Sequence, residues 1–208
     1  MSKPLSATPA SDVAFTPAVK AIQSARGSRE AYAAQERRGG FRTDIDDRLS
    51  GFLADVDTAY LATANADGQP YAQHRGGPRG FIRVVADQTL GFVDFAGNRQ
   101  YITTGNLGDN QKAFLFLMDY ARARRIKIWG RARVVPGSAD LLARLMPEGY
   151  RAQVEQVILF TVDAWDSNCP QHIPRKVDAA AAAEAIARLE ARITDLEAEN
   201  ARLKHAKP

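Results

Sequence analysis

The sequence predicts a mainly β protein with flanking helices, in which an antiparallel barrel is followed by a C-terminal coiled-coil helix. The chain has 208 residues, of which 45% are hydrophobic and 25% charged, values typical of a globular domain with a short appendage. Short runs rich in β-branched and aromatic residues alternate with tight-turn signals, and few long helices fall between them, which favours an antiparallel barrel. The tail, residues 177–208, instead carries apolar residues at helical spacing.

The composition excludes several classes of protein. The net charge is +4 and most basic residues are interspersed with acidic ones, so we expect no nucleic-acid surface. No stretch approaches the roughly 20 apolar residues that span a bilayer, and residues 1–12 lack the apolar core of a secretory signal. The single Cys169 excludes an internal disulfide and a multi-Cys zinc site. We expect a cytoplasmic protein without a metal site, with a disordered segment over 1–12.

Capping residues predict three helices before the first strand. Thr16 can cap a helix and Pro17 fits its first position, whereas Ser28 and Asp44 are candidate caps of the next two. Glycines follow the first two helical runs, where a left-handed residue commonly ends a helix. We therefore expect helices over residues 17–26, 29–37 and 44–55.

The pattern then changes from helical to extended. The run 58–64 is β-branched, aromatic and small, and Asp67-Gly68 predicts a hairpin turn to the next strand. The polar stretch 98–110 is expected to contain a helical turn, and a short helix fits 138–145. Strands are expected over residues 58–64, 70–74, 81–85, 89–94, 113–118, 125–135 and 156–162.

The tail has the heptad pattern of a coiled coil. A 3.5-residue apolar repeat makes one narrow stripe that an isolated helix cannot bury, and a single buried Asn can pair with its own copy. An amphipathic helix lying on its own domain is the alternative, but we expect self-association through this segment. The a and d positions hold Ile186, Leu189, Ile193, Leu196, Asn200 and Leu203.

Three polar, Gly-marked segments hold many of the side chains suited to planar or anionic ligands, over residues 73–81, 94–107 and 165–174. In the last segment, Cys169 and His172 are two metal-type side chains, fewer than the three or four that bind zinc. A Cys–His nucleophile pair is a further alternative, although a three-residue spacing between prolines gives no reason for contact. One segment alone therefore does not define a site.

Together, the polar segments resemble one known family. Gly-Asn-Arg-Gln at 97–100, continued by Thr-Thr-Gly-Asn-Leu at 103–107, is similar to a motif of the pyridoxamine 5′-phosphate oxidase-related, FMN-binding family. Gln-His-Arg-Gly-Gly-Pro at 73–78 and Asn-Cys-Pro-Gln-His-Ile at 168–173 extend the resemblance, which covers roughly residues 13–176. The substrate-binding signatures of the vitamin B6 oxidase itself are absent, so its reaction is not implied.

The resemblance implies a split β-barrel over 13–176 that forms a homodimer with FMN at the subunit interface. Arg99 and Thr103 would bind the phosphate, because a guanidinium pairs bidentately with phosphate oxygens and a hydroxyl adds a contact. Gly76 and Gly77 would let the backbone approach the flavin. The implied cofactor-binding residues are Gln73, His74, Arg75, Gly76, Arg99, Gln100, Thr103, Thr104, Asn106, Arg125, Lys127, Trp165, Asn168 and Gln171.

The implied function is that of an FMN-dependent oxidoreductase, which transfers a hydride or electrons through flavin N5 with a small organic molecule as substrate. Arg75 would stabilise the anionic reduced flavin, and His74 or His172 would relay a proton near neutral pH. Arg125 and Lys127 would reach the cofactor from the partner subunit. Two alternatives are a flavin-binding or sensor module without turnover, and a haem-binding relative.

Overall fold

The structure is a computed structural model that describes residues 8–167 and 171–205. The expectations for residues 1–7, for Asn168 and for Cys169 lie outside the described residues. The contacts divide the chain into two compact units. One unit comprises Met1–Asp119 and Arg124–Pro170, and the other comprises Tyr120–Ala123 and Gln171–Pro208, so the barrel and the tail are described separately.

The first helices begin where their capping residues predict, with two differences. Thr16 accepts a hydrogen bond of 3.3 Å from the Val19 N–H at the start of α1 (Pro17–Ala25), as expected of a cap. Ser28 precedes α2 (Arg29–Arg37) but its side chain makes no capping hydrogen bond. Residues 10–12 were expected to be disordered, yet Ala10–Val13 form a short 3-10 helix in which Ser11 is fully buried.

The cap of the third helix differs from the prediction. The helix α3 (Asp47–Asp55) is capped by Asp46, whose Oδ1 accepts a hydrogen bond of 2.9 Å from the Leu49 N–H. Asp44 lies outside the helix because its carbonyl oxygen accepts hydrogen bonds from the Asp46 N–H and from Trp165 Nε1. Residues 44–46 therefore form a connecting segment that the hydrogen bond from Trp165 attaches to the core. The helix begins three residues later than predicted.

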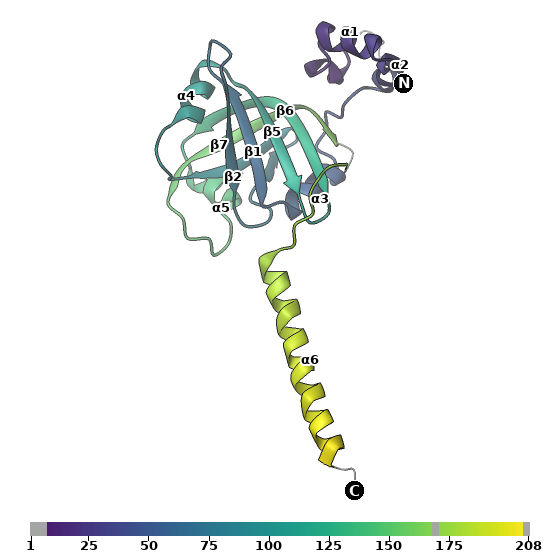
Figure 1. The fold of residues 1–208 in the computed structure, drawn as a ribbon. Coiled ribbons are helices and arrows are strands. Elements are labelled where there is room, and N and C mark those ends of the chain that lie inside the picture. Colours follow the sequence, from purple (N-terminus) through teal and green to yellow (C-terminus); the bar gives the residue numbers. More distant parts are fainter. Residues whose placement is uncertain (1–7, 168–170, 206–208) are drawn as a thin grey trace. The chain divides into compact units, whose positions relative to one another are not determined.

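The strands form a seven-stranded antiparallel sheet in the order β2-β1-β5-β6-β7-β4-β3, which confirms the predicted mainly β, split-barrel fold class. Figure 1 shows the curved sheet. A helix α4 (Ile102–Asp109) follows β4, and α5 (Ala139–Leu145) follows β6. The predicted strand from residue 81 begins at 83, because Phe81 and Ile82 are core residues before it. The strands are β1 (Thr58–Ala64), β2 (Pro70–Gly76), β3 (Arg83–Ala86), β4 (Thr89–Phe95), β5 (Lys112–Asp119), β6 (Arg124–Val135) and β7 (Val154–Ser167).

The sheet curls back on itself around an apolar core. Arg75 of β2 forms an ion pair with Asp94 of β4, although β1, β5, β6 and β7 separate these strands in the sheet. Such a pair requires the two ends of the sheet to approach one another, as in a barrel that is open along one seam. Alternate side chains of the strands fill the interior, including the fully buried Leu61, Leu115, Ile128 and Phe160.

The bend in the longest strand pair depends on Gly130. The register between β6 and β7 shifts at Trp129 and Gly130, which marks a β-bulge. A Cβ atom at position 130 would overlap the carbonyl oxygen of Thr161 and crowd the ring of Phe160. Only glycine therefore lets the two backbones approach this closely where the sheet turns.

The tail forms one long helix, α6 (Ala179–His205), as predicted. None of its described residues is buried in the chain. Within the described part of the chain, no helix combines the length and the apolar character needed to cross a membrane.

We expect Gly130→Ala to lower the free energy of unfolding by about 2 kcal/mol or more, because the added methyl group overpacks a closed backbone contact. Gly51→Ala is the matched control, since a Cβ there meets no atom within 4 Å and the residue lies in α3. The control should be neutral or stabilising, because Ala favours helix. Chemical denaturation of both variants measures the difference, and equal midpoints would show that Gly130 is not needed for the bulge.

Candidate functional site

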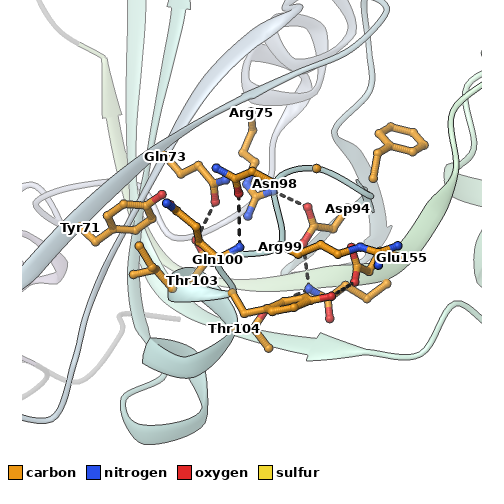
Figure 2. Close-up of a pocket in the computed structure, with 15 residues that line it drawn as sticks. Tyr71, Gln73, Arg75, Asp94, Asn98, Arg99, Gln100, Thr103, Thr104 and Glu155 are labelled. Atoms are coloured by element: carbon orange, nitrogen blue, oxygen red, sulfur yellow. Dashed lines mark hydrogen bonds and ion pairs between the residues drawn. The ribbon is translucent and has the colours of Figure 1, made fainter.

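A pocket of about 320 Å³ lies where β2, the loop after β4, the start of α4 and β7 meet (Figure 2). This volume is at the lower end of the range for small-molecule sites. The pocket brings together six of the predicted cofactor-binding residues, from two segments of the sequence. Its lining residues are Tyr71, Gln73, Arg75, Asp94, Phe95, Gly97, Asn98, Arg99, Gln100, Tyr101, Ile102, Thr103, Thr104, Glu155 and Gln156.

The alternation of β2 decides which of its side chains face this pocket. Tyr71, Gln73 and Arg75 are half-buried and line it, whereas the residues between them are exposed. Successive side chains of a strand point to opposite faces, so the side chain of His74 lies on the other face, edge-on to the ring of Tyr60 at 5.7 Å. The expectation that His74 faces the same ligand as Gln73 and Arg75 is therefore not met in this pocket.

A chain of polar contacts connects β2, β4, β7 and α4 across the pocket floor. Arg75 forms an ion pair with Asp94, and the side chains of both are largely buried. Gln156 Nε2 donates hydrogen bonds of 2.9 Å to Asp94 Oδ2 and of 2.9 Å to Thr104 Oγ1. Arg75 Nε is buried without a hydrogen-bond partner among the described residues. The network fixes Arg75 and leaves one of its donors for an additional acceptor.

The loop that enters α4 holds two non-glycine residues in the left-handed backbone region. Arg99 has φ 58° and Tyr101 has φ 55°. Bulky residues rarely adopt this conformation, and such strain is common at ligand sites, where the surrounding structure enforces it. Arg99 makes no hydrogen bond or ion pair within the described part of the chain. Its guanidinium is thus exposed and available to a ligand.

The two threonines of α4 differ in what they can donate. The Thr103 hydroxyl donates a hydrogen bond of 2.8 Å to Gln73 Oε1, and Thr103 is only 4% exposed. The Thr104 hydroxyl accepts its bond from Gln156, so its own proton remains free. Thr104 is therefore better placed than Thr103 to donate to an anion, whereas the motif favoured Thr103 as the hydroxyl that binds the phosphate. Gln73 keeps its amide Nε2 available toward the pocket.

Tyr101 and Glu155 close one side of the pocket. The Tyr101 hydroxyl donates a hydrogen bond of 2.5 Å to Glu155 Oε1. This hydrogen bond, more than desolvation or the charge of Glu155, raises the pKa of Tyr101 above its ordinary value of 10.0, while Arg99 lowers it. Tyr101 therefore acts as a neutral donor throughout the physiological pH range.

Other predicted residues of the barrel lie outside this pocket. Asn106 is buried and donates a hydrogen bond of 3.0 Å to Thr63 Oγ1, which attaches α4 to β1. Trp165 is a core residue, 1% exposed, and its Nε1 donates to the Asp44 carbonyl, so its ring is already packed. Gly76 is close to His74, where a Cβ would lie 2.8 Å from His74 Cε1.

Arg125 and Lys127 lie on the face of β6 opposite the buried Ile126 and Ile128, outside the pocket. Lys127 forms an ion pair of 3.3 Å with Asp166 and lies over the ring of Trp129. The Nε of Arg125 is buried without a hydrogen-bond partner among the described residues.

Two C-terminal candidates lie outside the compact unit that holds this pocket. Gln171 and His172 belong to the second compact unit, and His172 has a left-handed φ of 60°. Asn168 lies outside the described residues. In the described part of the chain, no cluster of three or more His, Cys, Asp or Glu side chains could hold a metal ion.

Sequence reasoning missed the acidic side of the pocket. Asp94 and Tyr101 lie in the polar segment that the sequence singled out, so their segment was found although their roles were not. Glu155 and Gln156 lie at the start of a strand and carry no motif. Only the pairing of β4 with β7, which sets Asp94 opposite Gln156, reveals them.

The fold and the pocket define the class of this protein. It is a split-barrel protein with a polar pocket that combines a free guanidinium, hydroxyl groups and amides. The sequence profile of pyridoxamine 5′-phosphate oxidase matches residues 45–169, more than half of the chain, and the chain belongs to this family. No curated protein matches the chain in sequence.

Solved structures with a similar fold include proteins with different ligands in their names. An FMN-binding protein from Syntrophomonas wolfei subsp. wolfei is 11% identical with a TM-score of 0.49, over 72% of this chain and 97% of its own. HupZ of Group A Streptococcus is 19% identical with a TM-score of 0.48, over 64% and 99%. HutZ, a heme storage protein from Vibrio cholerae, is 18% identical with a TM-score of 0.40, over 58% and 89%. Similarity at this level does not favour one ligand over another.

We expect Glu155→Ala to lower the pKa of Tyr101, because the carboxylate that stabilises the protonated phenol is removed. NMR titration of 13C-labelled tyrosine, with Tyr101→Phe to assign the signal, measures the change. Glu148→Ala removes an exposed carboxylate elsewhere and should leave the pKa unchanged. An unchanged pKa in Glu155→Ala would show that the hydrogen bond does not persist in solution.

Proposed function

We propose that this protein is an FMN-binding oxidoreductase that acts on a small organic molecule, as a homodimer with FMN at the subunit interface. The observation that carries the proposal is the Arg99 guanidinium, which lines the pocket without a partner among the described residues. A phosphate monoester suits this cation, because guanidinium and phosphate oxygens pair bidentately. Membership of the pyridoxamine 5′-phosphate oxidase family supports FMN as the molecule that bears the phosphate.

The residues of the pocket fit the phosphate end of FMN. Arg99 would bind two phosphate oxygens and the Thr104 hydroxyl would donate to a third, with Thr103 holding Gln73 in position (Figure 2). Gln100 lies in the same loop and lines the same pocket. The strained backbone of this loop supports the assignment, because such strain is common at ligand sites.

The charge balance of the pocket gives Glu155 a distinct role. Asp94 is compensated by Arg75, whereas Glu155 has no cation within ion-pair distance among the described residues and receives the Tyr101 hydroxyl. Its charge opposes an anion bound at Arg99, so it limits the affinity for phosphate. Removing this charge should therefore tighten the binding of a phosphate at Arg99.

The flavin ring would lie along β2. When bound, FMN supplies hydride or electron transfer at N5. Gln73 Nε2 would donate to a ring oxygen or nitrogen, and Arg75, held by Asp94, would place positive charge near the ring. His74 or His172 remains our candidate for the proton relay, and the side chain of His74 would act from the other face of β2.

The homodimer would complete the site. The pocket contains no aromatic floor from β6, and Arg125 and Lys127 lie on a different face of the barrel. Each would instead serve the site of a second copy, as the family resemblance implies.

We expect Arg99→Ala to weaken FMN binding by roughly ten- to a hundredfold, because a hydrogen bond to a charged group is worth ~1.5–3 kcal/mol. Arg37→Ala is the matched control, since it removes an exposed arginine of α2 outside the family match. Titration of the unloaded protein with FMN, followed by flavin fluorescence, gives both dissociation constants. Glu155→Gln should shift binding in the opposite direction and tighten it. Equal affinity of Arg99→Ala and the control would remove Arg99 from the phosphate site.

The visible spectrum of the purified protein tests the function as a whole. We expect a yellow protein whose flavin is released on denaturation and whose bound FMN is reduced by NADH, NADPH or a reduced deazaflavin. Reoxidation by a small organic acceptor would identify an oxidoreductase, whereas bound flavin that no donor reduces would indicate a sensor module. A colourless protein that takes up no added FMN but gives a Soret band with haem would overturn the proposal.

A further inference from the structure

The helix α6 carries a continuous apolar stripe that its own described contacts leave uncovered. Ile186 is 56% exposed, Leu189 65%, Ile193 54% and Leu203 60%. These residues follow one another at spacings that return to the same side of a helix every seven residues. A stripe of this length is costly to expose to water, and it points to a protein partner.

We propose that α6 binds the α6 helix of a second copy of this chain, as a parallel, in-register, two-stranded coiled coil. Ile186 and Ile193 occupy a positions, and Leu189, Leu196 and Leu203 occupy d positions. β-branched residues at a with leucine at d favour two parallel strands over three or four. The inference does not depend on FMN, because none of these residues lines the pocket.

The charged residues beside the stripe select this arrangement. In a parallel pair, a residue at g faces the residue at e five positions later in the other helix. Arg192 then faces Glu197 of the second copy, and Glu199 faces Lys204 of the second copy. Both pairs attract, and the symmetry doubles them. None of these four residues makes an ion pair or hydrogen bond within its own chain among the described residues.

An antiparallel pair of α6 helices is disfavoured by the position of Asn200. An antiparallel pair that aligned all the apolar positions would place Asn200 opposite Leu189 and bury an amide without a partner. Its charged positions offer no net attraction, because Glu190 would face Glu197 while Arg192 would face Glu199. In the parallel register, Asn200 meets its own copy and the two amides can hydrogen-bond to each other, which fixes the register.

Cysteine cross-linking of the full chain tests the contact and its orientation. In a Cys169→Ser background, Leu203→Cys should form a disulfide between two copies under mild oxidation, since position 203 meets itself only in the parallel register. A mixture of Ile186→Cys chains and Leu203→Cys chains should give little disulfide between unlike chains. Efficient 186–203 linkage would show an antiparallel pair, and the absence of 203–203 linkage at micromolar concentration would overturn the proposal.

Charge reversal tests the selectivity of the contact. Glu197→Lys with Glu199→Lys turns every g–e pair repulsive, so 203–203 linkage should fall about tenfold or more, because each pair contributes a few tenths of a kcal/mol and reverses sign. Glu184→Lys with Asp195→Lys makes the same change of charge at positions outside the stripe and should preserve the linkage. Co-expression of the first variant with a chain carrying Arg192→Glu and Lys204→Glu should restore linkage between unlike chains. Equal linkage in all combinations would contradict the assigned register.

Discussion

The closure of the sheet is the constraint on which the rest of the barrel depends. β2 and β4 are distant in the order of strands, yet Arg75 and Asp94 form an ion pair between them. The β6–β7 pair bulges at this point because β7 has an additional residue, Asp163, opposite Trp129 and Gly130, and a side chain at Gly130 would strike the carbonyl of Thr161. Closure also brings β2 beside the loop after β4, whose strand already pairs with the start of β7. The pocket therefore exists only as a product of closure, and no single segment contains it.

Within the pocket, most polar groups satisfy one another and a few do not. Asp94, Gln156, Thr103 and Gln73 are engaged in hydrogen bonds, which hold the walls in one arrangement. Arg99 stands apart, with a left-handed backbone and no partner in the described part of the chain. A pocket in which most other polar side chains are already hydrogen-bonded, with Arg99 as a cation unpaired among the described residues, is suited to binding an anion, because those side chains need not rearrange on binding.

The sequence predicted some elements better than others, for physical reasons. Thr58–Ala64 and Arg29–Arg37 were predicted to the residue, because turn or glycine signals bound them closely. Asp44 was the predicted cap of the third helix, but its carbonyl oxygen accepts a hydrogen bond from Trp165 Nε1, far along the chain. Sequence patterns report local preferences, and a tertiary hydrogen bond overrides such a preference without leaving a local signal.

By itself, the sequence determined the antiparallel β class, the polar segment that contains Arg99, and the heptad pattern of the tail. These are periodic or local properties, and a strand or helix repeats them wherever it lies. The tertiary structure alone decided that the Gln73 face of β2, and not the His74 face, lines this pocket and that Glu155 joins it. The physical reason is that facing and pairing depend on strand register and sheet curvature, which long-range contacts fix.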